Sequence, residues 1–504
     1  MTTVDRTGPL PLRIKLANGF GSIAFGVKDN GFSVFLLTFY NLVLGMEAWL
    51  VSLALVIALV VDAFVDPLLG NLSDRTYTRW GRRLPWLYLA AIPLGIAWYV
   101  LWSPPVDGPP SFTLLLGMAV LIRLLLSACE VPSVALVPEL TRDYDERTTL
   151  FRYRYLFGWT GGLGLLFLTY SVFLSDGLLD REGYETYGLV GAITIVAATL
   201  ISALGQHKFI ARYPETKPPP FSLKVAFGEI IESFSERAFL IFALGAVAAY
   251  ISQGMTFALS NYLFYFVWEF TESALAIYPF ILLASVVVAF LLLGTLHKRF
   301  GKIRVASVTT VLAMIFWLVP YGLRLAGLWP EVGSTVSTAL LFAFVLVSNS
   351  LSVMVLISAS SMVAEIVEAF QERTGRRAEA AFYSGNWFVQ KCATGVGILL
   401  AGLIISISGL PTDATPGAVA APIIDSVIVQ YCIMIALLGT FSAWWLARFP
   451  IDRADHEARL ATLDAAARGD IDASGTAPDR LRLGGAMRLC QFRRETESRD
   501  TKED

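Results

Sequence analysis

Long apolar segments separated by short polar connections recur along the whole 504-residue chain. Each apolar segment is about 20 residues or longer, which is the length that an α-helix needs to cross the hydrocarbon core of a bilayer. The pattern predicts twelve membrane-spanning helices, six on each side of one longer polar stretch. The predicted spans are 16–43, 47–70, 84–103, 112–137, 153–175, 187–206, 238–266, 272–296, 303–326, 335–367, 380–409 and 418–447.

This pattern predicts an all-α polytopic membrane protein with two six-helix bundles, at 1–206 and 238–447. Residues 207–237 would form a central cytoplasmic loop, in which the run Pro218-Pro219-Pro220 breaks any helix. Beyond that run, residues 222–235 are predicted to form a short interfacial helix. The tail at 448–504 is rich in Arg, Asp, Glu and Ala, so we expect it to be cytoplasmic and partly disordered.

Basic residues concentrate in the connections that follow the second, fourth, eighth and tenth predicted spans. Positively charged connections stay on the cytoplasmic side of a membrane, so we expect a multi-pass plasma (inner) membrane protein with both termini in the cytoplasm. The other connections carry little beyond Arg181 and Arg324. The basic residues that decide this are Arg75, Arg79, Arg82, Arg83, Arg142, Arg147, Arg152, Lys298, Arg299, Lys302, Arg304, Arg373, Arg376 and Arg377.

The two halves also share sequence motifs. Residues 137–148 match residues 363–374 without a gap, through V-P-E-L and V-A-E-I, each followed by E-R-T. Residues 70–75, G-N-L-S-D-R, match residues 294–299, G-T-L-H-K-R, at nearly the same offset. Two matches in register indicate duplicated halves in one orientation, as in major facilitator transporters.

Two aspartates, Asp62 and Asp66, lie inside the second predicted span. Their spacing puts both carboxylates on one face of a helix, about one turn apart. A carboxylate in hydrocarbon is costly and normally faces a watery cavity, a cation or a partner charge. The alternative is that both acids only hold helices together. We favour a cation site, where sodium would use oxygen ligands and a proton would titrate the same acids.

The composition changes this picture little. The chain is 55% hydrophobic and 16% charged, whereas soluble domains average about 25% charged residues. A net charge of −2 gives no reason to expect a nucleic-acid partner. The three histidines lie in connections or the tail, and no H-E-x-x-H motif, P-loop, zinc spacing or disulfide pattern occurs in the sequence. We therefore expect neither an enzyme nor a cofactor. A non-transporting sensor or scaffold is the remaining alternative, and it would need a folded output domain in the polar tail.

The stretch at 62–86 has the core D-x-x-x-D-P-x-x-G-x-x-S-D-R-T. It resembles the signature of the glycoside–pentoside–hexuronide:cation symporters, to which melibiose permease belongs. Residues 131–154 and the T-G-R-R segment that leads to Lys391 also resemble this family, and the likeness covers all twelve spans but not the tail. The resemblance implies a major facilitator fold whose cation and substrate meet near the middle of the membrane. Sodium-dependent lysolipid transporters share the first signature, so it identifies the coupling machinery better than the cargo.

Carried over by position, the resemblance implies a shared cation and substrate site. Val65 and Val134 depart from the family pattern, where an asparagine and a sugar-stacking tryptophan stand in sodium-coupled, galactoside-transporting members. The implied cation site is Asp62, Asp66, Ser127 and Glu130, and the implied substrate site is Lys28, Asp29, Glu130, Arg154 and Lys391. We include Trp387 among the candidate substrate residues. Further possible cavity residues, of a kind that more often holds helices together, are Tyr40, Tyr250, Asn261, Asn349 and Asn386.

The roles of several basic residues stay open. Lys391 could neutralise one of the two aspartates in the empty carrier or contact the substrate. Lys28 and Asp29 are adjacent and do not share a helix face, so one can pair across helices while the other points into the cavity. Arg123 lies about two turns before Glu130, on roughly the same side, and is better explained by an end-of-helix position or a structural ion pair than by a ligand contact.

Charged residues at the cytoplasmic helix ends are predicted to gate the inner mouth by ion pairs, besides setting topology. The gate residues are Asp74, Arg75, Arg82, Arg83, Asp143, Glu146 and Arg147. We expect a monomer that transports a small solute, most simply a sugar or glycoside, by cation-coupled symport with Na⁺ or H⁺. A lysolipid or other amphiphile is the alternative cargo, and membrane lipids are the remaining expected partners.

Overall fold

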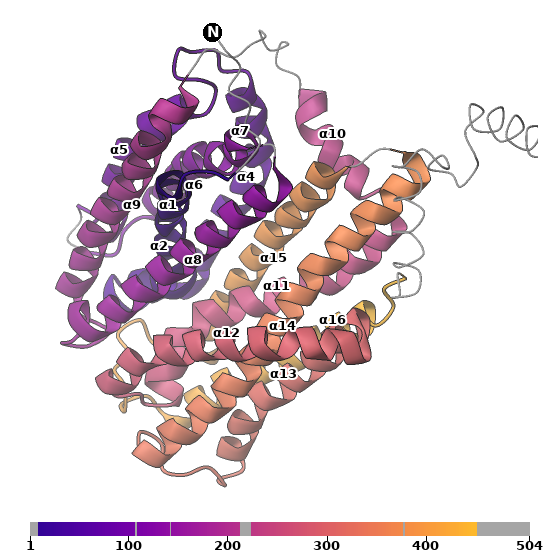
Figure 1. The fold of residues 1–504 in the computed structure, drawn as a ribbon. Helices are drawn as coiled ribbons and strands as arrows, with labels where there is room; N and C mark the ends of the chain where they lie inside the picture. The colour runs from indigo at the N-terminus through magenta and orange to yellow at the C-terminus, as the bar shows by residue number, and fades with distance from the viewer. Residues whose placement is uncertain (1–8, 106–107, 142, 212–222, 376–377, 451–504) are drawn as a thin grey trace, which may run out of the picture.

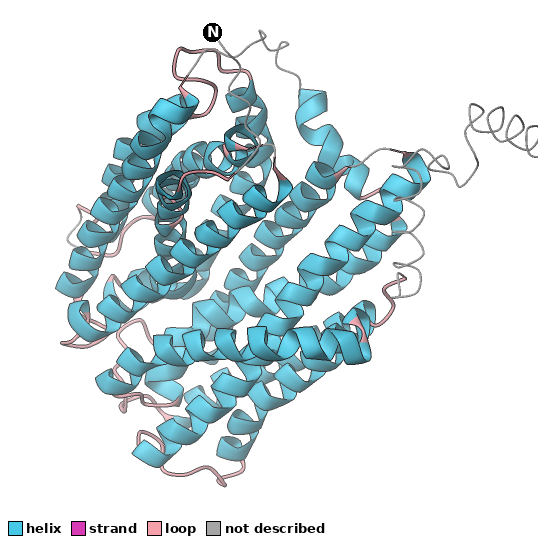
Figure 2. Cartoon of the chain, viewed as in Figure 1, coloured by secondary structure: helices cyan, strands magenta, loops and turns pink. Residues whose placement is uncertain are grey.

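The computed structural model describes residues 9–105, 108–141, 143–211, 223–375 and 378–450, and these residues are helical without strands (Figure 2). The predictions for Pro218-Pro219-Pro220, Arg142, Arg376, Arg377 and the tail beyond residue 450 fall outside the described residues. The first half of the chain holds α1 Leu12–Phe20, α2 Ile23–Asn30, η1 Gly31–Phe35, α3 Leu36–Thr38, η2 Phe39–Val43, α4 Ala48–Asp74, α5 Leu84–Trp102, α6 Phe112–Ala135, α7 Val137–Leu140, α8 Tyr144–Leu168, η3 Thr169–Phe173 and α9 Arg181–Ile210. The second half holds α10 Leu223–Ser233, α11 Arg237–Tyr262, η4 Leu263–Val267, α12 Glu272–Phe300, α13 Lys302–Leu325, α14 Thr335–Thr374, α15 Glu379–Ser408 and α16 Ala421–Leu446.

Eleven helices in the described ranges are long and apolar enough to cross a bilayer, and they match the second to twelfth predicted spans. The first predicted span, 16–43, is instead a broken run of short α- and π-helical pieces from α1 to η2. This run carries Lys28, Asp29 and Asn30 in its middle, which lowers its hydropathy. The predicted short helix in the central loop is present as α10.

The helices pack in the same order in both halves, which lie side by side (Figure 1). In the first half α4 packs on α6, α5 on α6 and α9, and α2 on α8. In the second half α12 packs on α14, α13 on α14 and α16, and α11 on α15 and α16. The halves meet where α4 packs on α15, α11 on η1, and α12 on α8 and η3.

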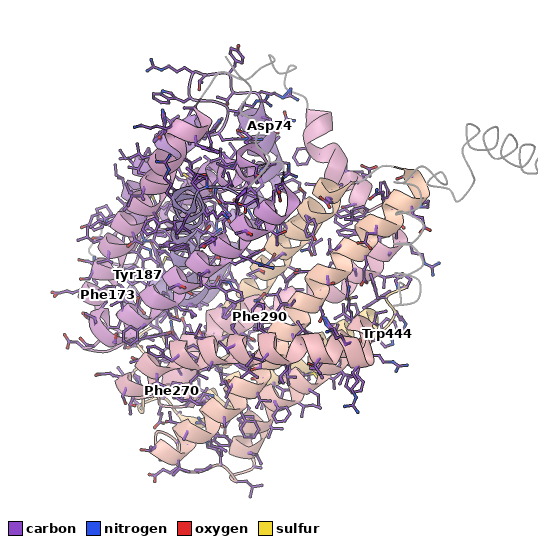
Figure 3. All side chains as sticks on the ribbon, viewed as in Figure 1. Asp74, Phe173, Tyr187, Phe270, Phe290 and Trp444 are labelled. Carbon is purple, nitrogen blue, oxygen red and sulfur yellow. The ribbon has the colours of Figure 1, made fainter. Side chains whose placement is uncertain are left out.

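The repeated motif makes an equivalent ion pair in each half. Glu139 accepts from Arg83, which precedes α5, at 3.4 Å, and Glu365 accepts from Lys302, which begins α13, at 2.6 Å. Arg83 also pairs with Asp74, which lies at the end of the molecule that we call the basic end (Figure 3). Phe173 and Phe270 lie toward the other end, which we call the opposite end.

Close packing of α4 on α15 depends on glycines of α15. A Cβ at Gly402 would lie 2.6 Å from the carbonyl oxygen of Ala48, and one at Gly395 would lie 2.9 Å from a methyl of Val56. We predict that Gly402→Ala lowers the free energy of unfolding by roughly 1–3 kcal/mol, because the two helices must separate to admit the methyl group. Thermal unfolding of the purified protein checks this. Gly294→Ala is the control, since a Cβ there meets nothing within 4 Å; equal losses would contradict the prediction.

Candidate cation and substrate site

Four helices carry most of the predicted site residues, and α8 carries Arg154. Helix α4 supplies Asp62 and Asp66, and α6 supplies Ser127 and Glu130. Helix α2 adds Lys28 and Asp29 from the same half, whereas Lys391 comes from α15 in the other half. The i, i+4 spacing on α4 puts both aspartates on the face that meets α15, so one lysine reaches both.

Asp62 is 2% exposed and uses both of its carboxylate oxygens. Oδ1 accepts a hydrogen bond from the Ser127 hydroxyl at 2.5 Å. Oδ2 lies 2.8 Å from Nζ of Lys391 and 3.5 Å from the guanidinium of Arg123. A buried carboxylate is tolerable only when paired and hydrogen-bonded, and these three partners meet that condition.

Asp66 is satisfied on one side only. Its Oδ2 lies 2.5 Å from Nζ of Lys391. Its other oxygen, Oδ1, is buried and has no hydrogen-bond partner within the described chain. The ammonium group of Lys391 therefore stands between the carboxylates of Asp62 and Asp66 as a positive charge supplied by the protein itself.

A second ion pair lies beside the first. Nζ of Lys28 lies 2.5 Å from Oε2 of Glu130 and 3.6 Å from Oδ1 of Asp29. Lys28 is buried, whereas the side chain of Asp29 is 70% exposed. The two adjacent residues therefore differ in role: Lys28 pairs with Glu130 of α6, whereas the carboxylate of Asp29 is exposed.

Two arginines complete the charged region. Arg154 is buried and donates to the Ser133 hydroxyl at 3.0 Å. Arg123 lies over the ring of Phe32 at 4.2 Å, and its Nε has no hydrogen-bond partner within the described chain. Its contact with Asp62 makes it part of the acid cluster, a role that sequence reasoning left open. The available signal was its position one turn before Ser127 on α6.

The ion-paired charges of this cluster balance, and the buried Arg154, which bonds to Ser133, stands outside these pairs. Three carboxylates face three basic groups, so a cation that enters the cluster must displace one of the basic groups or leave an excess positive charge. The carboxylates are Asp62, Asp66 and Glu130, and the basic groups are Lys28, Arg123 and Lys391.

Of the other predicted cavity residues, some are exposed and others make hydrogen bonds between helices. Trp387 lies on α15, one turn before Lys391, and is 48% exposed. Asn386 accepts from Tyr250 at 3.2 Å, a contact between α15 and α11. Tyr40 is buried and donates to the Leu101 carbonyl, so it holds helices together.

Predicted gate residues form ion pairs within the first half. Arg83 pairs with both Asp74 and Glu139. Glu146 pairs with Lys15 of α1 at 2.9 Å. Among the rest, Arg147 donates to the Thr141 carbonyl, Asp143 accepts from the Glu146 amide, Arg75 donates to Asn71, and Arg82 is half-buried.

At the opposite end, buried neutral hydrogen bonds join the two halves. Asn261 of α11 donates to the Val34 carbonyl at 2.9 Å and to the Thr38 hydroxyl at 3.2 Å, and it accepts from Tyr170 at 2.7 Å. The next residue, Tyr262, donates to Asn41 at 2.8 Å. The residues whose side chains make these bonds are at most 1% exposed, and we call them the opposite-end seal: Thr38, Asn41, Tyr170, Asn261 and Tyr262.

Comparisons with known proteins agree with this architecture. A family model described as MFS/sugar transport protein matches residues 17–453. An uncharacterised symporter of Synechocystis sp. is 28% identical over 475 residues, which cover 78% of this chain and 85% of that protein. The isoprimeverose transporter of Lactiplantibacillus pentosus is 24% identical, and the match covers 78% of this chain and 80% of that protein. The inner membrane symporter YicJ of Escherichia coli is 23% identical, covering 86% and 90%.

Solved transporters share the fold at low sequence identity. A POT family transporter in complex with 5-aminolevulinic acid has a TM-score of 0.61 at 14% identity, covering 87% of this chain and 95% of that one. A mutant of the nucleoside transporter NupG has a TM-score of 0.58 at 15% identity, covering 87% and 98%. The match over most of the chain, together with the helix packing, shows that this protein belongs to the MFS/sugar transport protein family and is a membrane transporter rather than an enzyme.

Proposed function

We propose that this protein is a cation-coupled symporter that moves a sugar or glycoside by alternating access. One observation carries the proposal: the ammonium group of Lys391, from one half, lies within 2.8 Å of both Asp62 and Asp66 of the other half. A site that holds a built-in cation between two carboxylates of one membrane helix can exchange it for a travelling one. Paired acids of this kind in a membrane helix commonly mark an ion pathway.

The coupling cation would take the place of the Lys391 ammonium. Its ligands would be the carboxylate oxygens of Asp62 and Asp66 and the Ser127 hydroxyl, all hard oxygen donors. The unpaired Oδ1 of Asp66 offers one contact that Lys391 does not use. Glu130 lies on the same face of α6 as Ser127 and connects this site to Lys28. Either Na⁺ or H⁺ could act here.

Substrate would bind beside the cation, where the released Lys391 can reach it. The proposed substrate residues are Lys28, Asp29, Glu130, Arg154, Trp387 and Lys391. The exposed carboxylate of Asp29 and the half-exposed ring of Trp387 offer the hydrogen-bonding and stacking surfaces that a sugar uses. Because linkage is reciprocal, cation and substrate would strengthen each other's binding. The relatives include one named as an isoprimeverose transporter and one named as a putative glycoside/cation symporter, and the comparisons do not favour the lysolipid cargo.

The structure would represent a conformation closed at the opposite end. We place the basic end in the cytoplasm because arginines and lysines crowd its connections, so the opposite-end seal would close the outer mouth. In the outward-open conformation, the seal would break and the predicted gate residues would pair across the two halves. Asp74, Arg75, Arg82, Arg83, Asp143, Glu146 and Arg147 remain the proposed gate.

Uptake by the full chain in proteoliposomes tests the proposal. Radiolabelled monosaccharides, disaccharides, uronates and a lysolipid are offered with an inward sodium gradient, an inward proton gradient or neither. We expect one sugar class to accumulate above equilibrium with one of the two gradients. Accumulation that needs no gradient, or accumulation of the lysolipid alone, would refute the proposal.

The opposite-end seal yields a separate prediction. Asn261→Leu removes three hydrogen bonds between the halves, so the outward-open conformation should become more populated. With the four native cysteines replaced, Leu37→Cys should react with an external maleimide about tenfold faster in this variant. Gln430→Leu is the control, since that amide donates to Ser408 and Ser426, both in the second half. Equal labelling rates in both variants would contradict the prediction.

A further inference from the structure

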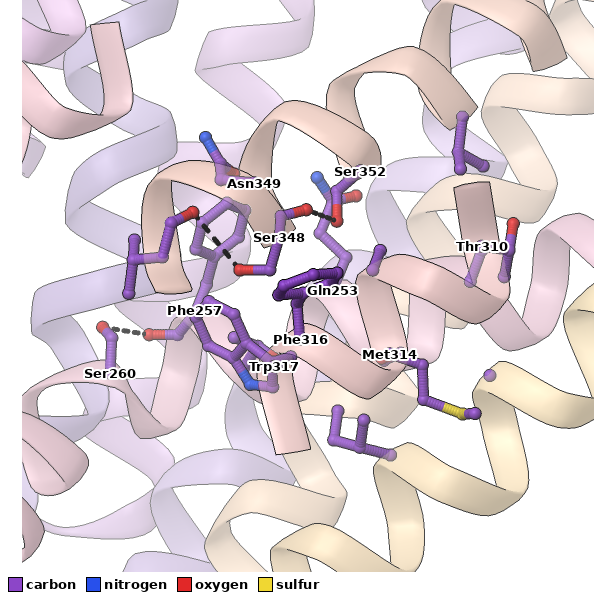
Figure 4. Close-up of a pocket in the computed structure, with 18 of the residues that line it drawn as sticks. Gln253, Phe257, Ser260, Thr310, Met314, Phe316, Trp317, Ser348, Asn349 and Ser352 are labelled. Carbon is purple, nitrogen blue, oxygen red and sulfur yellow. Dashed lines mark hydrogen bonds between the residues drawn. The ribbon is translucent and has the colours of Figure 1, made fainter. Parts of the chain in front are cut away.

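A cavity of about 240 Å³ lies inside the second half of the molecule (Figure 4). Helices α11, α13, α14 and α16 form most of its wall, and α12 adds Tyr278 and Leu282. All residues that line it lie between Ala246 and Leu446, so it has no wall from the first half. It is distinct from the acid cluster around Asp62, which α2, α4, α6 and α15 build, because none of these four helices lines it.

The lining of this cavity carries no charge: none of its residues is an Asp, Glu, Lys, Arg or His. Aromatic rings dominate one side, where Phe257 of α11 meets Phe316 and Trp317 of α13 (Figure 4). A charged ligand would lose its hydration here without gaining a partner charge, which costs several kcal/mol. The lining thus selects an uncharged ligand with a flat apolar body.

Several polar side chains nevertheless face the cavity. Ser348 and Ser352 of α14 donate their hydroxyls to carbonyls of their own helix, at 3.2 and 2.9 Å, so their oxygens remain free to accept. Asn349 donates to Ser285 at 2.5 Å. Trp317 donates to Tyr431 at 2.5 Å, away from the open space.

Gln253 is the exception among these groups. It lies in the middle of α11, is exposed, and has no hydrogen-bond partner within the described chain. Its side chain projects between Ser352 and the rings of Phe316 and Trp317 (Figure 4). An amide in the middle of a membrane helix normally bonds to a neighbouring helix, so an unused one facing a cavity indicates a ligand contact.

We propose that this cavity is a second ligand site, which takes an uncharged bicyclic aromatic alcohol or a molecule of that class. The flat ring system would lie against Phe257, Phe316 and Trp317, and its hydroxyl would bond to Gln253. A cavity of about 150 Å³ holds one benzene ring, so about 240 Å³ leaves room for a second ring. The site does not depend on symport, and its test measures binding rather than uptake.

Equilibrium dialysis of 2-naphthol against the purified full chain tests the site. The comparison probe is 2-naphthoate, which has the same ring system and carries a negative charge. We expect saturable binding of 2-naphthol and at least about tenfold weaker binding of 2-naphthoate. Gln253→Leu should weaken 2-naphthol binding about fivefold and leave the binding of naphthalene, which lacks the hydroxyl, unchanged.

A matched pair of variants on α14 separates occupancy of the cavity from general damage. Ser352→Phe places a ring inside the cavity and should abolish 2-naphthol binding. Ser360→Phe places the same ring on an exposed position outside the lining, where the serine likewise bonds only to its own helix, and should leave binding intact. Four outcomes would each overturn the proposal. These are non-saturable binding of 2-naphthol, equal binding of 2-naphthol and 2-naphthoate, and equal loss of binding in both serine variants. The fourth is a co-purified lipid that Ser352→Phe removes while 2-naphthol fails to bind. Should Ser352→Phe fail to fold, Gln253→Leu decides alone.

Discussion

Replacing Asp66 by asparagine should abolish cation-driven accumulation while the protein stays folded. Among the residues that the structure describes, Asp66 bonds only to Lys391, and Lys391 keeps its contact with Asp62, so the variant leaves no isolated buried charge. A travelling cation, however, would lose one of two carboxylates in a poorly hydrated site. Losing one partner of a buried charge pair costs about 3–5 kcal/mol, so cation affinity should fall by about 100-fold or more.

Two measurements check this result. Sodium or proton dependence of sugar uptake in proteoliposomes should disappear, whereas exchange of labelled for unlabelled sugar without a gradient should persist. Glu47→Gln is the control, because Glu47 is an exposed carboxylate directly before α4 whose side chain accepts a hydrogen bond from Trp49. Wild-type accumulation by the Asp66→Asn protein would remove Asp66 from the cation site.

The second large effect concerns the built-in cation. Lys391→Gln leaves Asp62 and Asp66 facing each other with one positive partner fewer. Without a bound cation, the free energy of unfolding should fall by roughly 3–5 kcal/mol, because Asp66 loses its positive partner and Asp62 keeps Arg123 as its one basic partner among the described residues. A bound coupling ion restores that charge, so the stability of this variant should depend much more steeply on the ion than that of the native protein.

Thermal unfolding at low and high sodium, with choline keeping the ionic strength constant, measures this dependence. Stabilisation by sodium identifies Na⁺ as the coupling ion, whereas stabilisation only by lowering the pH identifies H⁺. The double variant Asp66→Asn, Lys391→Gln restores the charge balance, so it should recover most of the lost stability. A Lys391→Gln protein as stable as the native one under all conditions would refute the exchange of a built-in for a travelling cation.

The repeat in the sequence predicted more of the architecture than hydropathy alone. Glu139 and Glu365 occupy matched positions in the two motifs, and each pairs with a basic residue at the start of a neighbouring helix, Arg83 before α5 or Lys302 in α13. The first span shows where the pattern was incomplete. Its charged middle at Lys28 and Asp29 interrupts the apolar run, and the chain there is a series of short helical pieces.

The sequence by itself determined the apolar helices, their order and the acids placed among them, because bilayer thickness and the cost of buried charge act on local stretches of chain. It also determined that Asp62 and Asp66 share a face. Only the tertiary structure decided which charges meet: that Lys391 reaches both acids, that Arg123 joins them, and that Asn261 seals one end. Pairing across 325 residues depends on how the two halves pack, and that packing energy is spread over many contacts that no local pattern records.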